Sequence, residues 1–126
     1  MDIDDLSEHD LIVLLMVEEL KDENYSKIKA DLPDHEKPDG IRFQKNISNR
    51  FVPDITAYKN DVFYILEIET VDSLFDEHSH HQWLAFSDYS KRTNSSFILV
   101  VPKRYKDSAR DILSEKNIIA EIWPKE

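Results

Sequence analysis

The chain has 126 residues, of which 40% are hydrophobic and 33% charged, and its formal net charge is −10. This length and composition predict one domain over residues 1–126, built around a single hydrophobic core. The absence of cysteine excludes disulfides and thiolate metal sites. No apolar stretch reaches the roughly 18 residues of a membrane span, and the acidic N-terminus lacks the pattern of a signal peptide, so we expect a cytoplasmic protein with no membrane partner.

The first predicted element is an amphipathic helix. Ser7 is a typical N-cap with Asp10 three residues on, and apolar residues then recur at helical spacing to about Glu23. Glu18 and Glu19 lie outside the apolar stripe, and we expect both to face solvent.

The segment after this helix is ambiguous. Residues 25–32 alternate between apolar and polar side chains and predict a first strand, and residues 31–40, which hold two prolines and the only glycine, predict a loop. Residues 41–47 either extend or replace that first strand, and the pattern does not decide between the two.

The middle of the chain predicts a β-hairpin. Its strands are Phe51–Tyr58 and the strongly apolar Val62–Thr70, separated by a polar break. With Asn60-Asp61 as a two-residue turn, Lys59 faces Val62. A turn at residues 59–60 is the alternative, and it keeps the same side chains on the same face.

The C-terminal third predicts alternating helices and strands. The expected elements are a helix over Phe75–Lys91, a strand over Ser96–Pro102, a helix over Tyr105–Lys116 and a strand over Ile118–Trp123 that Pro124 stops. Trp83, Phe86 and Tyr89 are expected to be core residues of the first of these helices. The spacing of His78 and His81 fits an exposed helix start better than a zinc site.

Three acidic residues meet on one face of the predicted hairpin. The register places Asp54 directly opposite Glu67, and Glu69 lies two residues further along the same strand and points the same way. Carboxylates in so apolar a setting are costly unless a cation meets them. Carboxylate oxygens are the ligands that Mg²⁺ and Mn²⁺ prefer, so the sequence predicts such a metal here.

These acids resemble a known motif. Pro53-Asp54 and Glu67-Ile68-Glu69 are similar to the two halves of the motif of the PD-(D/E)xK nuclease superfamily, which has the restriction-endonuclease-like fold. The resemblance implies an α/β protein whose αβββαβ core carries one extra helix and strand, with a mixed sheet flanked by helices. It also implies Mg²⁺ or Mn²⁺ held by Asp54 and Glu67, with the carbonyl of Ile68 as a further ligand.

The resemblance also assigns roles to other residues. Glu69 stands where the superfamily has a lysine that positions or activates water, so it is expected to contact the metal or orient the water. Lys59 is a candidate to supply the missing positive charge. The helix after the motif often contributes a glutamine, which implies a catalytic contact from Gln82. Relatives often add an acid from the first helix, where this chain has Glu18 and Glu19.

Two functions follow as hypotheses. The first is a metal-dependent endonuclease that acts on nucleic acid, DNA rather than RNA, with a homodimer as one expected state. The second is a catalytically inactive nuclease-fold protein that binds protein partners through its acidic N-terminal region. Residues 1–40 carry 13 acidic residues against four lysines, whereas the remainder is nearly neutral. Binding to nucleic acid is therefore expected to be weak, or to depend on a partner protein.

Overall fold

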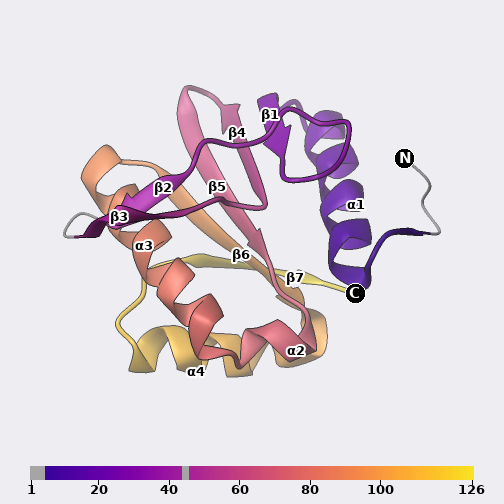
Figure 1. Cartoon of the computed structure of the whole chain (residues 1–126). Helices are drawn as coiled ribbons and strands as arrows, with labels where there is room; N and C mark the ends of the chain where they lie inside the picture. Colours follow the sequence, from indigo (N-terminus) through magenta and orange to yellow (C-terminus); the bar gives the residue numbers. More distant parts are fainter. Residues whose placement is uncertain (1–4, 44–45) are drawn as a thin grey trace.

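The computed structural model describes the main chain of residues 5–43 and 46–126, and the side chains of residues 5–42 and 50–126. The chain forms one mixed five-stranded sheet in the order β1-β4-β5-β6-β7 and a separate two-stranded sheet, β2-β3. Helix α1 covers one face of the large sheet, and α3 and α4 cover the other (Figure 1). The α/β class and the mixed sheet flanked by helices are therefore as predicted. No helix in the described ranges is long and apolar enough to cross a membrane.

Helix α1 spans Glu8–Asp22 and begins as predicted, because the Ser7 side chain accepts a hydrogen bond from the main-chain N–H of Asp10 at 3.1 Å. Strand β1 follows at Ser26–Ala30 and pairs with β4. The next segment does not extend or replace β1, contrary to both sequence-based alternatives. It forms β2 (Ile41–Phe43) and β3 (Asn46–Phe51), a hairpin that packs against α3 outside the main sheet.

The predicted central hairpin is present. Strand β4 spans Ile55–Lys59 and β5 spans Val62–Ile68, with Lys59 opposite Val62 as expected. The first strand is shorter than predicted. Phe51 ends β3 instead, and Pro53, which has no N–H to donate, separates the two strands.

The second half alternates helices and strands as predicted, with shifted ends. The elements are α2 (Val71–Leu74), α3 (Glu77–Thr93), β6 (Ser96–Pro102), the 3-10 turn Lys103–Tyr105, α4 (Lys106–Glu115) and β7 (Glu121–Lys125). Phe75 ends the extra helix α2 and does not open α3. Pro124 lies inside β7 and does not stop it, because β7 is an edge strand where a missing N–H is tolerated.

The core has two halves, one on each face of the sheet. Alternate residues of β5 enter opposite halves: Leu66 and Ile68 pack toward α1, and Ile65 packs toward α3 and α4. Glu67 alternates with its apolar neighbours and so faces the side of Ile65. Glu67 therefore points to the α3 face, at the end of β5.

Candidate carboxylate site

The site begins at the turn that sets the hairpin register. Asn60 and Asp61 both have positive φ, 53° and 65°, which is the requirement of a type I′ turn. The pairing continues without a bulge to Ile55 opposite Leu66, so Asp54 faces Glu67. The type of turn therefore sets the strand register, and this register places Asp54 opposite Glu67.

Two reciprocal hydrogen bonds hold Asp54 and Glu67 in place. The main-chain N–H of Asp54 donates to Glu67 Oε1 at 2.9 Å, and the N–H of Ile68 donates to Asp54 Oδ2 at 2.8 Å. Each carboxylate is therefore fixed by the main chain of the opposite strand. Ile68 contributes its N–H to Asp54, and the predicted role of its carbonyl as a metal ligand stays a prediction.

The electrostatics of Glu67 are unfavourable for a bare carboxylate. Glu67 is only 5% exposed. Burial raises the pKa of Glu67 well above its usual range, and the charges of Asp54 and Glu69 raise it further, against a smaller lowering by the hydrogen bond from Asp54. A cation beside this carboxylate would offset the electrostatic cost of burial and of the neighbouring negative charges.

The structure supplies one cation that the sequence analysis missed. His9, in the first turn of α1, lies with Nε2 3.1 Å from Asp54 Oδ2 and Nδ1 3.0 Å from Asp10 Oδ1. The hydrogen bond to Asp54 is the main cause that raises the pKa of His9 to about 9, opposed by burial and helped by the charges of Asp54 and Asp10. Because 45 residues separate His9 from Asp54, no local sequence signal indicates this contact.

Glu69 has hydrogen-bond partners of its own in α2 and α3. Trp83 Nε1 of α3 donates to Glu69 Oε1 at 2.7 Å, and the Ser73 hydroxyl donates to Oε2. Burial is the main cause of a raised pKa of Glu69, and these two hydrogen bonds lower it. Within the described ranges, no group of three or more His, Cys, Asp or Glu side chains is arranged to hold a metal ion. Glu69 thus hydrogen-bonds to α2 and α3, and the three-carboxylate metal site stays a prediction.

The other residues named from the sequence lie away from this centre. Gln82 is half-buried on α3, and no hydrogen bond joins it to the described carboxylates; its neighbour Trp83 makes the contact instead. Lys59 lies over the ring of Tyr25, 4.8 Å from its centroid, and so does not supply the charge at the site.

Surface residues of α1 and α3 have the surroundings that the sequence predicted. Glu18 pairs with Lys21 and Glu19 with Lys125, so neither adds an acid to the site. His78 and His81 are exposed, as expected for a helix start.

Asp54 and Glu67 retain donor capacity for a hard cation. Asp54 Oδ1 and Glu67 Oε2 accept no hydrogen bond from any residue that the structure describes. Two carboxylate oxygens at the start of β4 and the end of β5 fit the ligand chemistry of Mg²⁺ or Mn²⁺, so Asp54 and Glu67 would be the residues to hold such an ion.

A hollow opens beside this centre. It has a volume of about 160 Å³ and lies where β5 and β6 end, lined by Glu69, Val100, Arg104 and Lys125 among others. The carboxyl ends of neighbouring parallel strands are common ligand positions in α/β sheets. Comparison with known proteins identifies no relative, because no family model, curated protein or solved structure matches the chain.

Proposed function

We propose that this protein is a divalent-metal-dependent phosphodiesterase that cleaves nucleic acid, with Asp54 and Glu67 as the metal ligands. The observation that carries the proposal is a pair of main-chain hydrogen bonds, from the N–H of Asp54 to Glu67 and from the N–H of Ile68 to Asp54. They hold the two carboxylates near each other, while one oxygen of each accepts no hydrogen bond from the described residues. A buried acid with a strongly raised pKa beside a second acid is typical of functional sites.

The arrangement of the elements supports the restriction-endonuclease-like fold as part of this proposal. Omitting the β2–β3 hairpin and the short α2, the order is α1, β1, β4, β5, α3, β6, which matches the αβββαβ order that the motif resemblance implies. The PD-like pair immediately precedes β4, and the ExE segment lies at the end of β5, the antiparallel neighbour of β4, as that resemblance leads one to expect. Topology of this kind supports the assignment by analogy only.

A bound Mg²⁺ or Mn²⁺ would neutralise charge on the scissile phosphate and lower the pKa of an attacking water. The residues of the chain act around that chemistry. Asp54 and Glu67 are held rigidly by main-chain N–H groups, so little ordering is needed when a cation enters. His9 places positive charge beside Asp54, the kind of charge that the resemblance assigns to the absent lysine. Glu69 is fixed by Trp83 and anchors the end of β5 to α3.

The second candidate is a nuclease-fold protein without catalysis that binds a protein partner. One observation favours it: Glu69 is fully engaged by Trp83 and Ser73 and so is not free to orient water. In this alternative, His9 permanently supplies the counter-charge of Asp54, and no metal is required.

Heat stability in the presence of metal separates the two candidates. A ligand at about 100 times its Kd stabilises the folded state by about 2.7 kcal/mol. We expect Mn²⁺ to raise the Tm of the wild type and not that of Asp54→Asn. Asp107→Asn is the matched control, because Asp107 is an exposed aspartate on α4 that pairs with Arg110. Equal Tm shifts in all three proteins would contradict a metal site at Asp54.

A further inference from the structure

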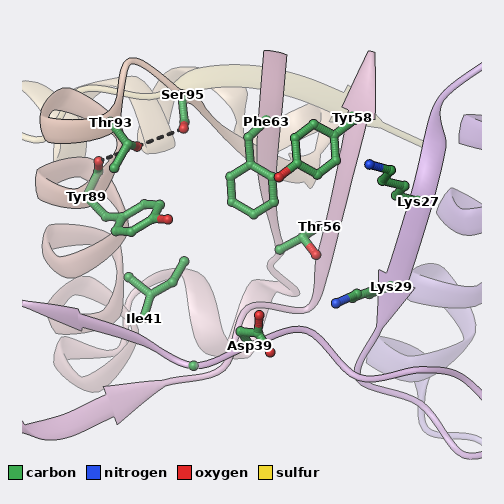
Figure 2. Close-up of a pocket in the computed structure, with 11 residues that line it drawn as sticks. Lys27, Lys29, Asp39, Ile41, Thr56, Tyr58, Phe63, Tyr89, Thr93 and Ser95 are labelled. Atoms are coloured by element: carbon green, nitrogen blue, oxygen red, sulfur yellow. Dashed lines mark hydrogen bonds between the residues drawn. The ribbon is translucent and has the colours of Figure 1, made fainter. Parts of the chain in front are cut away.

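A groove made of two adjoining hollows lies on the side of the sheet that α3 covers. Its larger part has a volume of about 510 Å³ and lies between β1, the β4–β5 hairpin and the end of α3 (Figure 2). A second hollow of about 490 Å³ shares Asp39, Gly40, Ile41 and Tyr89 with it and continues along the β2–β3 hairpin. We call the whole the basic–aromatic groove, after its main lining residues Lys27, Lys29, Tyr58, Phe63, Arg42 and Arg50.

Aromatic rings form one wall of the groove. Tyr58 of β4 and Phe63 of β5 are cross-strand partners with ring centroids 5.1 Å apart, and Tyr89 of α3 meets Phe63 edge-on at 6.4 Å. Tyr58 is 38% exposed, and all three rings line the hollow. A row of accessible rings offers π faces on which planar groups stack.

Figure 2 shows two lysines of β1 at the hollow: Lys27 points toward Tyr58, and Lys29 points into the hollow near Thr56. Lys27 lies in a bulge where the register shifts, has a φ of 50° and sets its Nζ 5.4 Å from the centroid of Tyr58. A positive φ is uncommon for lysine, and such strained positions cluster at binding sites. Lys29 has one ion pair, at 3.4 Å, with the exposed Glu36. Such surface pairs are weak, so both ammonium groups remain available to an anion.

The far end of the groove holds an arginine pair. Arg42 and Arg50 lie directly opposite each other in the β2–β3 hairpin, a placement that repels like charges. Neither forms an ion pair with an acidic side chain that the structure describes. The Arg50 side chain crosses Gly40, where a Cβ would lie 3.1 Å from that of Arg50. Arg92 donates to the carbonyl of Arg42 at 3.4 Å.

The charge of the groove is opposite to that of the chain. Five cationic side chains line its two hollows, and Asp39 is the single acidic one among the lining residues. The chain as a whole has a net charge of −10. Cations concentrated beside aromatic rings match the two chemical parts of a nucleotide, the phosphate and the base.

We propose that the basic–aromatic groove binds single-stranded nucleic acid and leads it to the carboxylate site. Bases stack on Tyr58 and its neighbouring rings, while phosphates contact the lysines of β1 and the arginine pair. Thr56 lines the groove and lies two residues after Asp54 on the same face, which is roughly 7 Å along the strand. This inference deepens the proposed function by naming the form of the substrate, and it rests on that function only for the cleavage that follows binding.

Binding in EDTA tests the groove separately from catalysis. The probe is a fluorescein-labelled oligothymidylate of about 12 nucleotides, with an oligouridylate of equal length as the RNA arm, followed by anisotropy at several salt concentrations. We expect Arg42→Gln with Arg50→Gln to weaken binding more than about tenfold and to reduce the salt slope by about 1.4, the value for two lost phosphate contacts. Lys91→Gln with Arg110→Gln is the matched control, because both residues are exposed and line neither hollow of the groove.

Tyr58→Ala should weaken binding at least about fivefold with an unchanged salt slope, because stacking does not release counterions. A duplex of equal length should bind more weakly than the single strand, since its bases are already stacked. Equal weakening in the arginine variant and its control, equal duplex binding, or tighter binding of an oligoglutamate peptide would each overturn the proposal. Groove binding without cleavage would instead contradict the proposed enzyme and leave the groove assignment intact.

Discussion

The carboxylate site and the basic–aromatic groove differ in both charge and burial. Asp54 and Glu67 place carboxylates in a largely buried position, where main-chain N–H groups and His9 hydrogen-bond to them. The groove places cationic side chains at the solvent-exposed surface, where Arg42 and Arg50 are cross-strand partners without a described acidic partner. The carboxylates are therefore preorganised by the fold, whereas the cations are left available to something outside it. This contrast is expected of a protein that positions chemistry at one end and collects an anionic chain at the other.

The largest expected effect is the loss of nuclease activity in Asp54→Asn. With Mn²⁺ and single-stranded DNA, we expect cleavage to fall by more than about 100-fold. Loss of a residue that only hydrogen-bonds to a metal ligand typically costs about 10–100-fold, and loss of a ligand itself should cost more. The asparagine can still accept the hydrogen bond from Ile68 but loses the charge that pairs with His9, so its Tm in EDTA should fall. Cleavage is therefore compared at a temperature at which both proteins are folded. If Asp54→Asn cleaves as fast as the wild type, the activity comes from a contaminant, and the proposal that Asp54 is part of a catalytic site is wrong.

Trp83→Phe should destabilise the fold next most strongly. The change removes the 2.7 Å hydrogen bond to the buried Glu69 and leaves a carboxylate oxygen short of a donor, at a cost of about 1–3 kcal/mol. Urea unfolding of Trp83→Phe should show this loss. In a Glu69→Gln background the same change should cost less. An undiminished cost there would show that packing, not the hydrogen bond, is responsible.

Glu67→Gln should stabilise the folded protein in EDTA while abolishing metal binding. Because the folded-state pKa of Glu67 is raised, its native carboxyl holds a proton that the unfolded chain has lost above about pH 4.5. Stability therefore falls as the pH rises above 4.5, and the neutral glutamine avoids that fall. The measurement is Tm against pH for both proteins. A lower Tm for Glu67→Gln at neutral pH would contradict the electrostatic account.

His9 should give the metal-free protein a second pH dependence. Its pKa rises from 6.5 to about 9 on folding, so its contribution to stability is complete below pH 6.5 and is lost as the pH rises through 9. We expect His9→Gln to flatten the stability curve between these values. The exposed His78→Gln should leave it unchanged. Saturating Mn²⁺ should also reduce the His9 effect, since metal and imidazolium compete for Asp54.

The smallest effect is expected at the turn whose register places Asp54 opposite Glu67. Asp61 adopts a φ of 65°, which glycine accepts without strain. We expect Asp61→Gly to raise the free energy of unfolding by less than about 1 kcal/mol, as an Asn-Gly type I′ turn is favoured. Asp61→Val should lower it, since a β-branched residue resists this conformation. Denaturant midpoints of the two variants check the assigned turn.

The sequence by itself determined the α/β class, the first helix with its Ser7 cap, the Asn60-Asp61 turn and the position of Asp54 opposite Glu67. Each of these depends on contacts between close neighbours in the chain, or on the period of two that a hairpin imposes. The tertiary structure alone decided that His9 meets Asp54, that Trp83 rather than Gln82 reaches Glu69, and that the segment after Gly40 leaves the main sheet. It also decided that scattered basic residues of β1, β2 and β3 gather beside the rings of β4 and α3. Such contacts join residues far apart in the chain, and only the packing of helices on the sheet brings them together.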